Sequence, residues 1–138
     1  MPVLYTAHAN VTGGREGTGE TDDKKLSVTL SRPGSTGTGT NPEQLFAVGY
    51  AACFAGAVGF VAGQKKLETG AISIQSEVTL NQDDKGFSLA VTLNVLLPSL
   101  DKSEAAELVK EADKVCPYSK GLRGNVPVTL KANGEQVN

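Results

Sequence analysis

Residues 41–63 read NPEQLFAVGYAACFAGAVGFVAG and hold the longest apolar stretch of the chain. Asn41, or Thr40 before it, is a helix-capping residue, and Pro42 suits a first helical turn. Glu43 adds a negative charge near the positive end of the helix dipole. The side chains that follow are small or apolar on most faces, which is typical of a buried helix. We therefore expect a central buried helix here, and its weak hydrophobicity argues against a membrane span.

Strand patterns lie on both sides of this helix. Before it, apolar residues alternate with polar ones over residues 3–11 and 26–30, which predicts two strands that pair across a glycine-rich connection. After it, the same alternation covers residues 72–80 and 87–97. The turn residues between these two runs, 81–86, predict an antiparallel hairpin.

A second helix and a last strand complete the pattern. Asp101 with Glu104 resembles a capping box, and apolar residues at helical spacing follow as far as Cys116, before Pro117. Residues 126–130 alternate again and predict a short strand. The order ββ-α-ββ-α-β indicates an α+β fold, with antiparallel sheets around the buried helix, in a single domain over residues 1–138.

The composition excludes several classes of function. With 39% apolar and 20% charged residues, the chain has the make-up of a soluble globular domain. A net charge of -2 without a block of Lys or Arg argues against nucleic-acid or anionic-membrane binding. The first residues lack the pattern of a signal peptide, so we expect a cytoplasmic protein. In that compartment a disulfide is more often catalytic than structural.

Cys53 and Cys116 are the two cysteines of the chain, and each lies on the apolar stripe of an expected helix. Free cysteines are often simply buried, so two packed core residues are one interpretation. A metal site is disfavoured, because two cysteines and a distant His8 do not make a tetrahedral ligand set. A redox-active dithiol is the remaining interpretation.

A dithiol that reduces peroxides needs a thiolate. A free cysteine has a pKa of about 8.5, and an apolar pocket disfavours the charged form further. A nearby cation must offset this. Arg15, in the glycine-flanked loop of residues 13–17, is one candidate, and Arg123 is another. Glu43 could orient Arg15 through a bidentate ion pair.

The spacing of Glu43 and Cys53 limits how such a site can form. Ten residues of straight helix span about 15 Å, so these side chains cannot meet on one unbroken helix. Either the helix breaks near Gly49, or a second copy of the chain supplies Glu43. We therefore expect a homodimer with shared active sites.

Six segments, spread over almost the whole chain, resemble the organic hydroperoxide resistance branch of the OsmC/Ohr family of thiol peroxidases. They occur in the order and at the spacing of that family. The segments are Tyr5-Thr-Ala, Gly13-Gly-Arg-Glu-Gly17, Thr40-Asn-Pro-Glu-Gln-Leu-Phe46, Gly49-Tyr-Ala-Ala-Cys-Phe54, Val115-Cys-Pro-Tyr-Ser119 and Arg123-Gly-Asn125.

The resemblance implies an OsmC-like fold, an intertwined homodimer with two active sites at its interface, and an antioxidant function. Cys53 matches the peroxidatic cysteine and Cys116 the resolving one, which together form a redox-active disulfide. Arg15 and Glu43 match the pair that holds the thiolate and the peroxide. The implied reductant is a dihydrolipoyl group on a lipoylated partner protein, and no bound cofactor is implied.

The substrate and two departures from the family need separate mention. Phe46 and Tyr50 would line an apolar pocket for alkyl or fatty-acid hydroperoxides, in which each buried CH₂ contributes about 0.8 kcal/mol. Asp113 and the segment 120–122 differ from the residues that the family often has beside the resolving cysteine.

Two other functions stay open on the sequence. The first is a dithiol oxidoreductase or redox sensor without fast peroxidase activity, which would exchange readily with other disulfides. The second is a dimeric binding module for an apolar ligand, whose packed thiols would resist alkylation in the folded protein.

Overall fold

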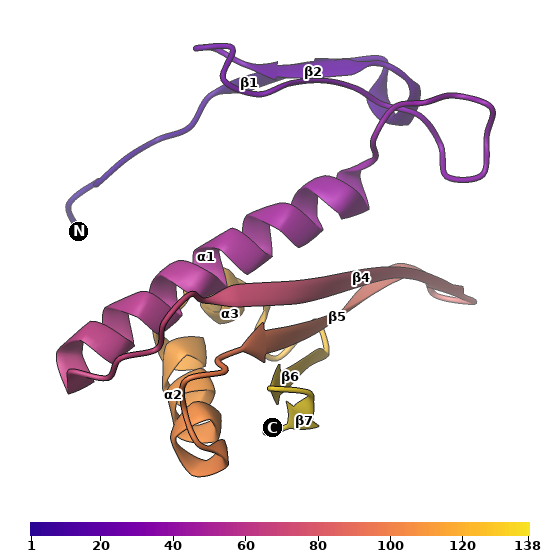
Figure 1. Ribbon diagram of the computed structural model, residues 1–138. Coiled ribbons are helices and arrows are strands. Elements are labelled where there is room, and N and C mark those ends of the chain that lie inside the picture. Colours follow the sequence, from indigo (N-terminus) through magenta and orange to yellow (C-terminus); the bar gives the residue numbers. More distant parts are fainter. The chain divides into compact units, whose positions relative to one another are not determined.

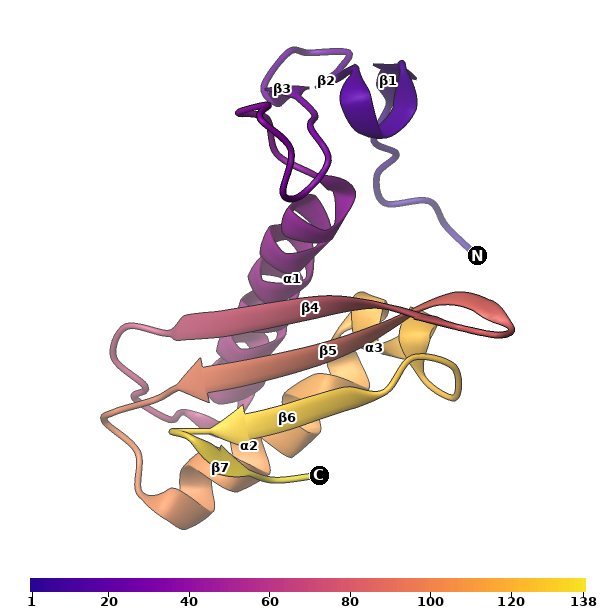
Figure 2. The same ribbon diagram turned by 90° about the vertical axis from the view of Figure 1, so that its right-hand side faces the viewer.

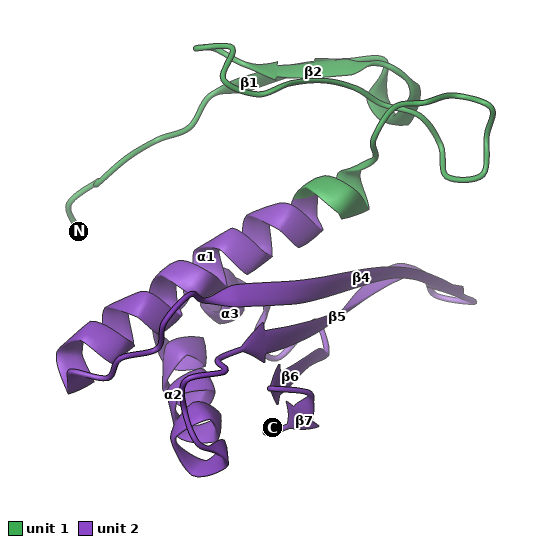
Figure 3. Ribbon diagram, viewed as in Figure 1, with its two compact units in different colours: residues 1–45 green, residues 46–138 purple.

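The computed structural model describes residues 1–138 and divides into two units, residues 1–45 and 46–138 (Figure 3). The expected single domain over residues 1–138 stays a prediction. The observed elements are more numerous than the seven expected, because short strands and a short helix add to the same α+β pattern.

The first unit holds a three-stranded antiparallel sheet in the order β1-β2-β3 (Figures 1 and 2). Its strands are β1 (Ala9–Thr12), β2 (Thr18–Thr21) and β3 (Ser27–Thr29), and a single 3-10 turn, η1 (Gly14–Glu16), follows β1. The expected direct pairing of residues 3–11 with 26–30 is wrong, because β2 lies between β1 and β3. Gly19 of β2 is buried and pairs with Val11 on one side and Val28 on the other.

Helix α1 (Pro42–Lys65) covers the expected residues and continues without a break through Gly49. Its buried residues recur at helical spacing along one face: Tyr50, Phe54, Ala57, Val58, Val61 and Ala62. Val48 and Phe60, in contrast, are 72% and 58% exposed. The helix is long and apolar enough to cross a membrane, a test that core helices of soluble proteins also pass. One face of the helix is therefore buried in the second unit, and exposed apolar residues lie on other faces.

The second unit contains a four-stranded sheet in the order β4-β5-β6-β7. Strands β4 (Ser73–Asp83) and β5 (Gly86–Leu96) form the expected antiparallel hairpin, whose turn narrows to Asp84 and Lys85. Strand β6 (Val128–Ala132) pairs with β5 in parallel, and β7 (Glu135–Gln136) closes the edge. The expectation of purely antiparallel sheets is therefore wrong at β6, because the chain crosses over through helices before it returns.

That crossover consists of α2 (Lys102–Val115) and α3 (Pro117–Leu122), which lie with α1 behind one face of the sheet (Figure 2). The Asp101 carboxylate accepts a hydrogen bond from the Glu104 backbone N–H at 2.8 Å, so the predicted helix start is confirmed. The core between sheet and helices includes Leu93 and Leu130 from the strands and Leu108 from α2.

Candidate functional site

Arg15 and Glu43 form a bidentate ion pair within the first unit. The Arg15 Nη1 and Nη2 atoms donate to Glu43 Oε2 and Oε1 at 2.9 and 2.6 Å. The hydrogen bonds from Arg15 lower the pKa of the Glu43 carboxyl, against the opposing effect of its burial. The same pair raises the pKa of the Arg15 guanidinium, so both groups are charged at neutral pH. The pairing that the sequence suggested is therefore present.

Local backbone geometry places these two side chains. Gly13 has φ 81°, in the left-handed region that favours glycine, and it precedes the 3-10 turn that carries Arg15. A Cβ atom at Gly17 would collide with the Thr12 carbonyl oxygen, so only glycine fits where the turn returns to the sheet. At the start of α1, Asn41 Oδ1 accepts the Gln44 backbone N–H at 2.9 Å. Asn41 is thus the cap that sets Glu43 in the first turn.

Cys53 and Cys116 lie together within the second unit. The Cys116 thiol donates to Cys53 Sγ at 3.5 Å, and both cysteines are free thiols. Cys116 is fully buried between α2 and α3, whereas Cys53, on α1, is partly exposed. A disulfide needs an S–S distance near 2.0 Å, so the sulfurs must approach by about 1.5 Å to bond. The two thiols are placed for reversible disulfide formation.

The surroundings of Cys53 within its unit oppose ionisation. Burial raises the pKa of the Cys53 thiol, and the neighbouring Cys116 adds to this increase. The backbone N–H of Tyr118 hydrogen-bonds Cys53 and lowers the pKa, but burial is the larger effect. Arg123, the alternative cation, instead donates from Nη2 to the Asp113 backbone oxygen at 2.9 Å. A thiolate at Cys53 therefore needs a positive charge beyond these contacts.

Three aromatic side chains pack together in the second unit, two from α1, which also carries Cys53, and one from the segment after Cys116. The ring of Tyr118 stacks on those of Phe46 and Tyr50, with centroid distances of 6.1 and 5.9 Å. Phe46 is partly buried, as a pocket wall would be, whereas Tyr50 is fully buried. Sequence reasoning missed Tyr118 as a site residue, although it lies two positions after Cys116 in the Cys-Pro-Tyr-Ser segment.

The hydroxyl groups of Tyr50 and Ser119 form a buried hydrogen bond at 2.6 Å. This bond ties α3 to α1, and Tyr50 and Ser119 also line a small pocket of about 150 Å³ with Asp113 and Arg123. Tyr50 therefore contributes to packing and to this polar pocket. Its predicted contact with substrate stays a prediction.

Replacing Ser119 with alanine should lower the free energy of unfolding by about 1–3 kcal/mol, because the buried Tyr50 hydroxyl would lose its partner. Tyr50→Phe tests the other partner, and the double variant should cost less than the sum of the two single ones. Urea unfolding followed by circular dichroism measures all three. Strictly additive effects would show that the hydroxyl pair contributes no coupling.

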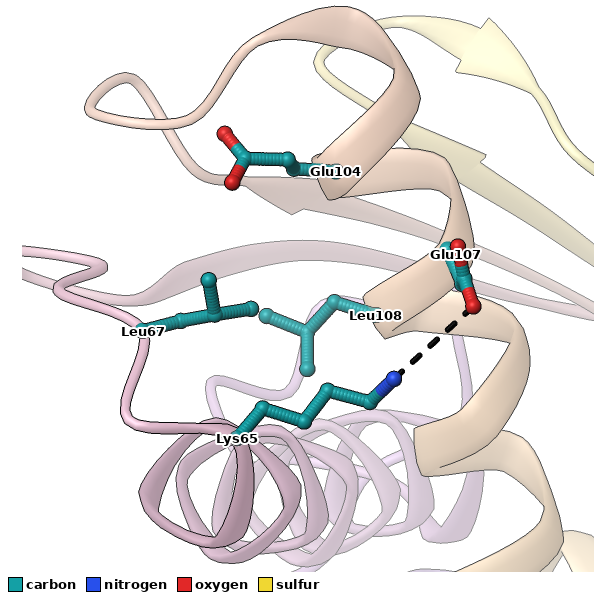
Figure 4. A pocket seen from close by; sticks show the side chains of 5 residues that line it. All are labelled: Lys65, Leu67, Glu104, Glu107 and Leu108. Carbon is teal, nitrogen blue, oxygen red and sulfur yellow. Dashed lines mark ion pairs between the residues drawn. The ribbon is translucent and has the colours of Figure 1, made fainter.

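A larger pocket of about 340 Å³ lies elsewhere in the second unit, between the end of α1 and α2 (Figure 4). Leu67 and Leu108 lie at its apolar part, and Lys65 reaches across toward Glu107, with Nζ and Oε1 3.8 Å apart. Lys65 also pairs with Glu111 at 3.3 Å. None of the predicted catalytic residues lines this pocket.

The fold and the paired thiols together define an α+β protein with a dithiol site. The OsmC-like protein family matches residues 34–131 of the chain. An organic hydroperoxide resistance protein of Xanthomonas axonopodis pv. citri is 53% identical over 93% of this chain and 94% of its own length. The organic hydroperoxide resistance protein OhrB of Bacillus subtilis is 46% identical over 94% and 98%.

Solved structures agree with the sequence comparison. A crystal structure of an organic hydroperoxide resistance protein from Legionella pneumophila superposes with a TM-score of 0.90 at 46% identity, covering 95% of this chain and 98% of the other. One from Vibrio cholerae, with captopril bound in one of the active sites, gives 0.93 at 41% identity, covering 99% and 96%. The chain belongs to the OsmC/Ohr family, as its six segments suggested.

Proposed function

We propose that this protein protects cells against organic hydroperoxides by reducing them to alcohols, with Cys53 as the nucleophile and Cys116 as the resolving thiol. The observation that carries the proposal is the 3.5 Å contact between the two sulfurs. Support also comes from relatives of nearly equal length that are named for organic hydroperoxide resistance.

The proposed cycle transfers two electrons from a dithiol to the peroxide. The Cys53 thiolate attacks the terminal, hydrogen-bearing oxygen of the peroxide, the O–O bond breaks, and the alkoxide takes a proton to leave as the alcohol. Cys53 is left as a sulfenic acid. The Cys116 sulfur then displaces water from it, and the Cys53–Cys116 disulfide forms. An external dithiol reduces that disulfide by thiol–disulfide exchange.

Arg15, oriented by Glu43, would supply the positive charge that Cys53 needs. The Arg15 guanidinium would stabilise the thiolate and polarise the peroxide. Glu43 would fix the orientation of the guanidinium through the bidentate ion pair. Because α1 is unbroken through Gly49, its geometry separates Glu43 from Cys53 by about 15 Å along the axis. A homodimer in which each copy supplies Arg15 and Glu43 to the other's cysteine pair meets this constraint.

The aromatic side chains of the second unit bear on the substrate, whereas the reductant and the location rest on the family resemblance. The rings of Phe46 and Tyr118 beside Cys53 favour an apolar alkyl or fatty-acid chain on the hydroperoxide. We propose a dihydrolipoyl group on a lipoylated protein as the reductant, and a cytoplasmic location, in which such a dithiol is available. No bound cofactor takes part in this cycle.

Stopped-flow mixing of the reduced protein with cumene hydroperoxide or hydrogen peroxide tests the proposal. The organic peroxide should oxidise Cys53 at least about tenfold faster, because its apolar group is buried against the aromatic rings. Loss of one thiol per chain, followed by loss of the second, measures both steps. Equally slow reaction with both peroxides would contradict a peroxidase.

A dithiol oxidoreductase or redox sensor is the second candidate. The observation that favours it is the pair of free thiols 3.5 Å apart, an arrangement that serves exchange with other disulfides as well as resolution of a sulfenic acid. Such a protein would react slowly with every peroxide and yet exchange rapidly with small disulfides. The same stopped-flow instrument, with oxidised lipoamide in place of peroxide, separates the two functions.

A further inference from the structure

Cys116 occupies the corner between two helices. Its backbone N–H donates to the Ala112 carbonyl at 2.9 Å, which ends α2, and its own carbonyl accepts the Lys120 N–H at 3.0 Å, which begins α3. The position of its sulfur therefore depends on how the two helices are held against each other. Cys116 is also fully buried, so its thiol reaches Cys53 only through this placement.

Asp113 and Arg123 lie on either side of Cys116 in the sequence and contact each other. Arg123 follows the last residue of α3, and its Nη2 donates to the Asp113 backbone oxygen at 2.9 Å and to the carboxylate Oδ2 at 3.4 Å. Asp113 lies three residues before Cys116 on α2. The guanidinium thus bridges the end of α3 and the last turn of α2, with Cys116 between them.

We propose that Asp113 and Arg123 are positioning residues that hold the Cys116 thiol within reach of Cys53. The inference gives a role to Asp113, one of the positions at which the chain departs from the family pattern. Its catalytic meaning rests on the proposed function, because a resolving thiol is needed only where Cys53 becomes a sulfenic acid.

The short distance between the two sulfurs explains why the position of Cys116 must be held by other residues. The sulfurs are 3.5 Å apart, and a misplacement of about 1 Å can slow a reaction between positioned groups a hundredfold. The side chains of Arg123 and Asp113 are 50% and 27% exposed, so their pair is partly solvated and contributes little to overall stability. Removing it should loosen the corner without unfolding the protein.

Three substitutions test the positioning role of Asp113 and Arg123, because they remove both, one or neither of the hydrogen bonds between these residues. Arg123→Met keeps an unbranched apolar stem but removes the guanidinium and both of its hydrogen bonds. Asp113→Ala removes only the weaker carboxylate contact, and Asp113→Asn keeps an acceptor at both positions. Lys65→Met is the matched control, because it removes another cation paired with α2, one that contacts Glu107 (Figure 4) and Glu111 rather than Asp113.

The first measurement is the equilibrium between the dithiol and the Cys53–Cys116 disulfide in glutathione buffers, quantified by alkylation and mass spectrometry. Arg123→Met should lower the effective concentration of the two thiols about tenfold. Asp113→Ala should have a smaller effect, and Asp113→Asn and Lys65→Met should match the wild type. This equilibrium does not involve peroxide, so it tests the positioning role of Asp113 and Arg123 even if the proposed peroxidase function fails.

The second measurement follows the two steps after mixing with cumene hydroperoxide. In Arg123→Met, formation of the Cys53 sulfenic acid should keep its wild-type rate, while its loss to the disulfide slows about tenfold and trapping by dimedone increases. Slower sulfenic acid formation instead would make Arg123 the cation of the thiolate and overturn the positioning role. Wild-type behaviour of Arg123→Met and Asp113→Ala in the glutathione equilibrium would overturn it as well.

Discussion

Replacing Cys53 with serine is expected to abolish the reduction of cumene hydroperoxide, by at least about a thousandfold. A serine hydroxyl stays protonated at neutral pH and cannot accept the peroxide oxygen, so no sulfenic acid forms. The partly exposed Cys53, rather than the buried Cys116, is the thiol that an external peroxide can reach. Consumption of peroxide in the presence of reduced lipoamide measures the loss.

Cys116→Ser is the matched control for this prediction, because it removes the other thiol of the same pair. It should still consume one equivalent of peroxide at the wild-type rate. Cys53 then has no neighbouring thiol to form a disulfide, so excess peroxide should drive it on to sulfinic acid. Turnover by Cys53→Ser would contradict its role as nucleophile, and sustained normal cycling by Cys116→Ser would contradict resolution.

The elements that the sequence predicted correctly are those with strong local signals. Helix α1 has a cap, a first-turn proline and a long apolar run, and α2 begins where the Asp101 carboxylate caps Glu104. Strand β2 was missed because Thr18-Gly-Glu-Thr21 has no apolar alternation and forms a strand only between two neighbours. The parallel pairing of β6 depends on the crossover through α2 and α3, which no local pattern encodes.

The candidate site also combines residues that sequence patterns indicate with contacts that depend on the folded structure. Two cysteines and the need for a nearby cation limited the candidates to a Cys53–Cys116 pair with Arg15 or Arg123, and the family resemblance then selected Cys53, Cys116, Arg15 and Glu43. The structure shows the Cys53–Cys116 and Arg15–Glu43 contacts. The bond of Arg123 to the Asp113 backbone joins α2 to the residue that follows α3, a helix that the sequence did not predict. Sequence reasoning placed one helix end at Cys116 but did not predict α3, so it could not predict what holds that cysteine.

Replacing Arg15 with methionine is expected to slow peroxide reduction at neutral pH on the order of a hundredfold, because the thiolate loses its stabilising charge. Burial raises the pKa of Cys53, and a nearby guanidinium lowers it. Without that charge the thiolate fraction falls at neutral pH, and activity should recover as the pH rises. The pH dependence of Cys53 alkylation measures this shift directly, and an unchanged profile would contradict the role of Arg15.

Mixed dimers test the proposed homodimer and decide whether Arg15 acts on the Cys53 of its own chain or on that of a second copy. In a dimer of one Arg15→Met chain and one Cys53→Ser chain, exchange between copies leaves one site with both an intact Arg15 and an intact Cys53. Dimers purified through two different tags should then recover about half of the wild-type activity at neutral pH, although the Cys53→Ser parent is inactive and the Arg15→Met parent retains about a hundredth of it. If Arg15 served its own chain, neither site would be complete and no activity would return. The unbroken α1, which keeps Glu43 and Cys53 apart on one helix, predicts recovery.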